Sequence, residues 1–156
     1  IAGDALEGAI TQWLVKTHQV GIGERTAAKL KLRIGSAIPV SQPEQLRIRG
    51  RDLNGGSPKE LALDTNDIVE AMQPAIQAIS RTVSDVLAQT PPELSADIID
   101  RGLLLCGGGS LLPGLDQVLR NSTGLPVLSV ENPDLAAVSG AAKLLEDPEL
   151  FERVVA

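Results

Sequence analysis

The sequence predicts an α/β protein, and three observations lead to this fold class. Two short apolar runs, residues 103–105 and 127–130, flank a glycine-rich turn and a helical pattern. A strand, a helix and a strand of this length form a parallel β-α-β unit. Residues 45–51 and 59–63 alternate apolar and polar positions around a turn, which is typical of an antiparallel hairpin. Several longer segments carry apolar residues at helical spacing.

The first segment is expected to form a helix that begins at Gly3-Asp4 and ends near residues 16–19. Asp4 is the expected N-cap, and Glu7 stands three residues later, at the acidic position of a capping box. The apolar stripe of this helix consists of Leu6, Ala9, Ile10, Trp13 and Leu14. Residues 20–23 are expected to form a linker.

A second helix is predicted over residues 24–34, and Gly35 is expected to end it. Its basic residues stand out in an acidic chain: Arg25, Lys29, Lys31 and Arg33. They form either a solvated helix face or the wall of a cleft that accepts an anionic ligand. The predicted hairpin also has a basic face, formed by Arg47, Arg49 and Arg51. Solvation is the ordinary interpretation of that face, and binding of a partner is the alternative.

Asp64 to Asp67 are expected to cap a long helix that ends at Thr90-Pro91-Pro92. Pro74 lies inside its apolar pattern, which predicts a kink or a break. A short helix is predicted over residues 93–100. Asn132-Pro133-Asp134 is expected to cap a helix of small residues, and a surface helix is expected over residues 147–156.

The glycine-rich turn is the first candidate site. Gly107, Gly108 and Gly109 have no Cβ atoms, so the backbone is open to close approach by a ligand. Ser110 is the expected N-cap of the next helix, through Leu119. Backbone amides at a helix N-terminus suit a nucleotide or another anion. The alternative is a tight turn required only for packing.

Composition excludes several function classes. The formal net charge is −6, so the chain is poorly suited to neutralise the phosphates of a nucleic acid. The only aromatic residues are Trp13 and Phe151, which leaves few side chains on which bases could stack. Both observations argue against a nucleic acid as the partner. The single cysteine, Cys106, rules out an internal disulfide and is expected to be buried in its apolar strand. The single histidine, His18, is expected to be a surface or helix-capping residue without a metal partner.

Several segments together carry a family resemblance. They are Gly3-Asp4-Ala5-Leu6, Ile22-Gly23-Glu24-Arg25-Thr26-Ala27, Gly35-Ser36-Ala37, Arg49-Gly50-Arg51-Asp52-Leu53, Thr90-Pro91-Pro92-Glu93-Leu94-Ser95-Ala96-Asp97-Ile98, Arg101-Gly102 and Gly107-Gly108-Gly109-Ser110-Leu111-Leu112. On these residues, the chain resembles the C-terminal half of the MreB family, the bacterial actin-like proteins that determine rod shape. The resemblance covers essentially all 156 residues.

The resemblance implies an actin-like (ribonuclease H-like) ATPase fold, in which two α/β halves close on ATP and Mg²⁺. This chain would be most of the second half. Residues 1–20 and 66–156 would form its inner subdomain, without the first strands of the sheet, and residues 21–65 its outer subdomain. The chain begins at Ile1 and its only methionine is Met72, so we expect a piece of a longer product.

The resemblance also implies the site residues. Gly107, Gly108, Gly109, Ser110 and Leu111 match the family's adenosine motif, and Ala28, Lys29, Leu30 and Lys31 would form the opposite wall. The family usually has Glu at the position of Ala28, where it bonds the ribose hydroxyls, and Ala lacks that bond. Loss of a charged hydrogen bond costs about 1.5–3 kcal/mol.

The family's phosphate loops and metal-binding Asp lie upstream of Ile1. We therefore expect no catalytic or metal-binding residue in this segment, no ATP hydrolysis by it alone and no tightly bound cofactor. The implied parent is a cytoplasmic filament subunit that binds ATP and Mg²⁺, reaches the membrane through the absent half and organises wall synthesis. Its implied partners are other copies of itself in the filament, and wall-synthesis and membrane scaffold proteins.

Two other functions remain open at this point. Sugar kinases and heat-shock ATPases share the fold, so an enzyme or a chaperone-type ATPase is one alternative. A nucleotide-independent interaction module is the other, and Ala28 motivates it.

Overall fold

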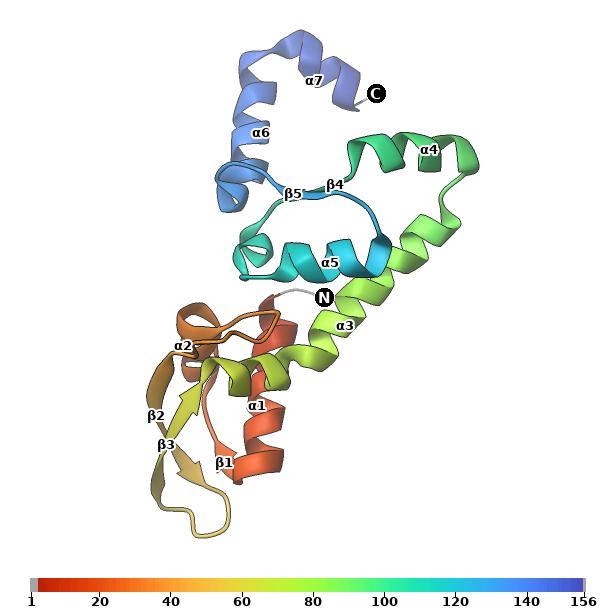
Figure 1. The fold of residues 1–156 in the computed structure, drawn as a ribbon. Coiled ribbons are helices and arrows are strands. Elements are labelled where there is room, and N and C mark those ends of the chain that lie inside the picture. Colours follow the sequence, from red (N-terminus) through yellow and green to blue (C-terminus); the bar gives the residue numbers. More distant parts are fainter. Residues whose placement is uncertain (1–2, 156) are drawn as a thin grey trace.

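The computed structural model describes residues 3–155, and Figure 1 shows an elongated arrangement with a sheet near each end of a long helix. The first part contains α1 (Gly3–His18), β1 (Val20–Gly21), α2 (Glu24–Ile34), β2 (Gln45–Asp52) and β3 (Pro58–Asp64). The connecting helices are α3 (Thr65–Gln89) and α4 (Pro92–Arg101). The second part contains β4 (Leu103–Leu105), the 3₁₀ turn η1 (Gly108–Leu111), α5 (Leu115–Thr123), β5 (Val127–Ser129), η2 (Pro133–Leu135), α6 (Ala136–Glu146) and α7 (Pro148–Val155).

The first sheet is antiparallel and has the strand order β1-β2-β3. The predicted hairpin is confirmed, with Leu46 opposite Leu63 and Arg49 opposite Glu60. The expected linker at residues 20–23 was wrong in part, because Val20 and Gly21 form β1 and pair with Asp52 and Arg51. Two residues that pair with a distant strand carry no local pattern from which to predict them.

One hydrophobic core joins the helices. Leu6, Ile10 and Leu14 of α1 are buried against α2 and α3, so the predicted apolar stripe is the buried face. The predicted apolar edge of α2, formed by Ala27, Leu30 and Ile34, is buried as well. From the second part, the core receives Leu112, Leu115, Leu119 and Val127.

The helix termini agree only partly with the expected caps. Asp64 caps α3, since its carboxylate accepts hydrogen bonds from the amides of Asn66 at 2.8 Å and Asp67 at 3.0 Å, and Asp67 completes the capping box. The α3 helix continues through Pro74 without a break. Asp4 is not an N-cap, because it lies inside the first turn of α1. No side chain of the Asn132-Pro133-Asp134 segment caps α6, which follows η2 directly.

The β4 and β5 strands are parallel, as predicted, but neither is buried on both faces. Leu104 and Leu128 are paired across the strands, and both are exposed, whereas Val127 is buried toward α5. Cys106 is exposed, so its expected burial was wrong. The physical reason is the same for all three exposed residues: in the described chain, no layer covers the second face of this two-stranded sheet.

Helices α6 and α7 extend away from the first sheet, at the opposite end of the view in Figure 1. Both helices are formed as predicted, although α6 buries none of its side chains. His18 is the last residue of α1 and is half-buried, with its ring centroid 5.1 Å from that of Trp13. Among the residues described, no helix is long and apolar enough to cross a membrane.

Candidate functional site

A cleft lies between the start of α1, the second half of α2 and the glycine-rich turn. Its volume is about 630 Å³, within the range of about 300–1,000 Å³ for small-molecule sites. Its lining residues come from segments more than 70 residues apart in sequence: Gly3, Leu6, Lys31, Leu32, Arg33, Gly35, Gly108, Gly109, Leu111, Leu112 and Pro113. The fold therefore brings one predicted wall, at Lys31, against the other, at the glycine turn.

The glycine wall is open toward the cleft. Gly107 has a φ of +82°, a conformation that side chains other than glycine rarely adopt. A Cβ atom added at Gly107, Gly108 or Gly109 would meet no atom within 4 Å. These three positions therefore leave backbone accessible to a ligand, and only the first requires glycine for its conformation.

Ser110 stabilises this turn and does not cap α5. Its hydroxyl donates to the carbonyl of Gly107 at 2.7 Å, inside the η1 turn. The α5 helix begins four residues later than expected for such a cap, at Leu115, and Gly114 precedes it with a φ of +79°. The expected N-cap was wrong because Ser110 lies inside the separate η1 turn, and the left-handed Gly114 is the residue that precedes α5.

Lys31 forms the opposite wall, and its ammonium group is held by α1. It makes a salt bridge with the carboxylate of Glu7 and lies 3.5 Å from the carbonyl oxygen of Gly3. The Lys31 and Glu7 side chains are only 17% and 22% exposed. The capping-box position predicted for Glu7 is thus used for a contact between two helices, which fixes a cation at the edge of the cleft.

The other predicted residues of α2 do not line this cleft. Leu30 is fully buried in the core. Ala28 is half-buried and lies one helical turn before Lys31 and Leu32, outside the lining of the cleft. Lys29 lines a second pocket, beside β2. Since successive residues of an α-helix are rotated by about 100°, four consecutive positions cannot all face one ligand. Of the nine predicted residues, Lys31, Gly108, Gly109 and Leu111 line the cleft, and Gly107 and Ser110 shape the turn behind it.

Residues that sequence reasoning did not assign to the site hold its two walls together. Ser36 is buried, and its hydroxyl donates to the carbonyl of Ile38 at 2.7 Å, with the carbonyl oxygen of Pro113 also within reach at 3.3 Å. The amide of Ala37 also donates to the Pro113 carbonyl, at 2.8 Å. These bonds tie the end of α2 to the segment after the glycine turn. The available signal was Gly35-Ser36-Ala37, one of the segments that carry the family resemblance.

The cleft suits the nucleoside part of a nucleotide. Glycine backbone permits close approach of a flat ring, Leu6 and Leu111 supply apolar contact, and the cations of Lys31 and Arg33 supply donors. Within residues 3–155, no group of three or more His, Cys, Asp or Glu side chains is placed to hold a metal ion.

The family model and the relatives that match this chain all belong to one family. Residues 1–153 match the family model described as MreB/Mbl protein. The chain is 38% identical over 147 residues to the cell shape-determining protein Mbl of Bacillus subtilis, and 40% identical over 146 residues to the cell shape-determining protein MreB of Escherichia coli K12. These alignments cover 94% of this chain but only 44% and 42% of the relatives, so the chain spans less than half of their length.

Solved structures show the same fold. The crystal structure of MreB5 of Spiroplasma citri bound to AMPPNP superposes with a TM-score of 0.90 at 27% identity, over 99% of this chain and 46% of that one. The MamK double helical filament has a TM-score of 0.69 at 20% identity, over 94% and 45% of the two chains, and supports the fold alone. The predicted actin-like α/β fold is therefore confirmed.

Proposed function

Because the chain belongs to the MreB/Mbl family of actin-like, cell shape-determining proteins, we propose that it supplies the nucleoside-side wall of an ATP site in a filament subunit. The whole protein would bind ATP and Mg²⁺, polymerise in the cytoplasm and organise wall synthesis from the membrane surface. The family match favours this function over the enzyme and chaperone alternatives.

The single observation that carries the proposal is the convergence of Lys31 with Gly108, Gly109 and Leu111 on one cleft. These residues were predicted from two segments far apart in sequence. The Spiroplasma citri MreB5 structures, bound to AMPPNP and to ADP, add support because their fold matches this chain closely.

The two-subdomain division remains part of this proposal. Residues 21–65, with α2 and the antiparallel sheet, would be the outer subdomain, and the rest would be the inner one. The cleft lies between α2 and the glycine turn, where two such subdomains would meet. Phosphate and Mg²⁺ contacts would come from the part of the whole protein that this chain does not include, so this segment alone would bind ATP weakly and would not hydrolyse it.

The alanine at position 28 favours a second candidate function, that of a nucleotide-independent interaction module. Alanine at this position provides no hydrogen bond to a ribose, and the Glu7 carboxylate near the cleft is already paired with Lys31. In this alternative, the actin-like surface is kept and the cleft has no nucleotide.

Isothermal titration of ATP with Mg²⁺ into the whole protein separates the two candidates. We expect micromolar binding, weakened about tenfold by Lys31→Met, since a hydrogen bond to a charged group contributes about 1.5–3 kcal/mol. Lys29→Met is the matched control, because it removes the same charge from the same helix outside the cleft. Absence of binding to the whole protein would exclude the first candidate, and micromolar binding would exclude the second.

A further inference from the structure

A second pocket lies between α2 and the strands β2 and β3, and it shares no lining residue with the proposed nucleotide cleft. Its volume is about 560 Å³, and we call it the basic edge pocket. Its lining residues are Thr26, Lys29, Arg47, Ile48, Arg49 and Glu60. Three cations and one carboxylate give this lining a net positive charge. The surrounding residues 21–65 are also basic, with eight Lys or Arg against five Asp or Glu, in a chain of net charge −6.

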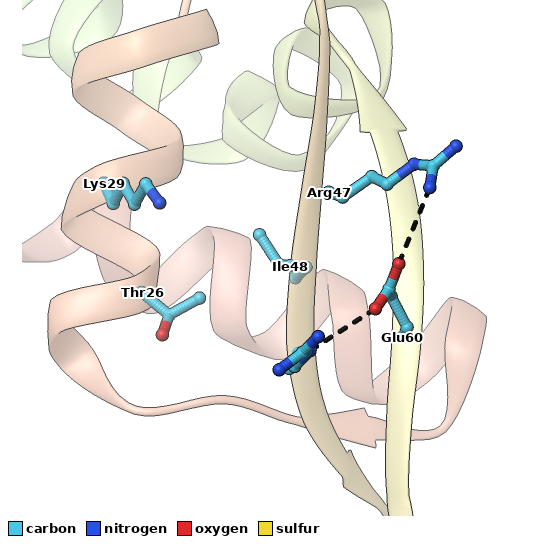
Figure 2. Close-up of a pocket in the computed structure, with 6 residues that line it drawn as sticks. Thr26, Lys29, Arg47, Ile48 and Glu60 are labelled. Atoms are coloured by element: carbon cyan, nitrogen blue, oxygen red, sulfur yellow. Dashed lines mark hydrogen bonds and ion pairs between the residues drawn. The ribbon is translucent and has the colours of Figure 1, made fainter.

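The basic edge pocket follows the edge of β2. Side chains alternate between the two faces of a strand, so Ile48 points to one face and Arg47 and Arg49 to the other. Figure 2 shows Ile48 directed toward α2, where Thr26 and Lys29 lie, and Arg47 directed away from it. A pocket lined from both faces of one strand must pass along the edge of that strand.

This edge of β2 has no strand beside it over most of its length. In the described chain, β1 pairs only with Arg51 and Asp52, whereas β3 pairs with β2 from Gln45 to Arg51. The β2 residues 45–49 therefore have a strand partner on one side only, whereas Gly50 lies close to Val20, Gly21 and Ile22. Free strand edges present backbone donors and acceptors that bind added strands.

The arginines are spaced for an extended acidic chain. Arg47 and Arg49 are two residues apart on one face of β2, a repeat of about 6.6–6.8 Å that an extended peptide shares. Glu60 lies between them, 3.9 Å from Arg47 and 3.3 Å from Arg49, as the dashed lines in Figure 2 mark. One carboxylate satisfies few of the ten N–H donors of two guanidinium groups, so both arginines keep donors for carboxylates of a ligand.

We propose that the basic edge pocket binds an acidic segment of a partner protein, in extended conformation, as an added strand along the free edge of β2. Carboxylates at alternate positions of that segment face Arg47 and Arg49, and Lys29 contributes a third positive charge from α2. Side-chain cations spread along a strand fit such a peptide better than a single phosphate, which is typically bound by clustered backbone amides.

Fluorescence anisotropy with a labelled eight-residue peptide of alternating Glu and Thr tests the proposal on the 156-residue chain. We expect saturable binding that weakens with added salt. The double variant Arg47→Gln/Arg49→Gln is expected to bind roughly tenfold more weakly, because each exposed ion pair contributes a few-fold. Arg51→Gln is the matched control and is expected to change binding less than about twofold, because Gly21 already occupies the strand edge there. Both variants change exposed side chains, and circular dichroism checks that they are folded.

Four outcomes would overturn the proposal. One is an equal loss of binding in Arg51→Gln and in the double variant, which would indicate general charge attraction. Another is binding that is unchanged when alternate peptide amides are N-methylated, which excludes an added strand. Displacement of the peptide by equimolar pyrophosphate would indicate a small-anion site. The last is self-association of the chain in the absence of peptide that is abolished in the double variant, because it would show that a second copy of the chain occupies the pocket.

Discussion

The contact between Glu7 and Lys31 provides the sharpest test of the cleft geometry. It joins α1 to α2 and holds the cation that forms one wall of the cleft. We propose a double-mutant cycle with Glu7→Gln, Lys31→Met and the double variant. The control cycle uses Glu60→Gln and Arg49→Met, whose ion pair lies on the exposed face of the hairpin at 3.3 Å.

The expected magnitudes follow from burial. Exposed ion pairs contribute about 0.2–1 kcal/mol, whereas removal of one partner from a fully buried pair costs about 3–5 kcal/mol. The Lys31 and Glu7 side chains are 17% and 22% exposed, which places their pair between these limits. We expect each single variant to lose about 2 kcal/mol of unfolding free energy, with a coupling of about 1–1.5 kcal/mol. The Arg49 and Glu60 side chains are 85% and 48% exposed, so their coupling should stay below about 0.5 kcal/mol.

Urea unfolding measures both cycles. The transition is followed by circular dichroism and by the fluorescence of Trp13, the only tryptophan. Added salt should weaken the coupling of the control pair and leave most of the coupling between Glu7 and Lys31. A Glu7–Lys31 coupling no larger than that of the control pair would show that burial does not strengthen this ion pair.

Three further predictions concern positions where the structure specifies a role. Leu30→Ala should lower the free energy of unfolding by about 2–5 kcal/mol, because Leu30 is fully buried in the core. A variant of unchanged stability that loses only ATP binding would instead identify Leu30 as a contact of the ligand. Gly114→Ala should lower the free energy of unfolding in urea by about 1–3 kcal/mol more than Gly124→Ala. Both glycines have a positive φ, but only at Gly114 would an added Cβ atom lie 2.5 Å from Ile38. Equal losses in the two variants would show that Ile38 adapts freely. Asp64→Ala should lower the free energy of unfolding by about 0.5–2 kcal/mol, because it removes the cap of α3. The control Glu70→Ala, at an exposed position of the same helix, should change it by no more than about 0.5 kcal/mol. Thermal unfolding that ranks the two variants in reverse order would contradict the capping role.

Much of the fold could be predicted because its helices and hairpin carry local patterns. The apolar stripe of α1, the buried edge of α2 and the Asp64 cap of α3 all follow from residues within one or two helical turns of each other. The family resemblance added the prediction of the actin-like fold as a whole. Both walls of the candidate cleft were also named, since the glycine turn and α2 were each identified as binding segments.

The errors have a common cause, which is dependence on distant parts of the chain. The short strand β1 exists only because β2 lies beside it. Cys106 and Leu104 belong to an apolar run that predicts burial, yet burial requires a second layer that the described chain does not place there. The left-handed Gly114, which lies against Ile38, moves the start of α5 beyond Ser110.

The sequence by itself determined the fold class, the family and the two segments that face each other across the cleft. Only the tertiary structure decided which side chains of those segments do so. Leu30 and Lys31 are neighbours in sequence, but the helix rotation buries one in the core and directs the other to the cleft, where Glu7 holds it. Periodicity depends on short-range geometry that the chain carries locally, whereas exposure, pairing and cleft lining depend on contacts between residues far apart in sequence.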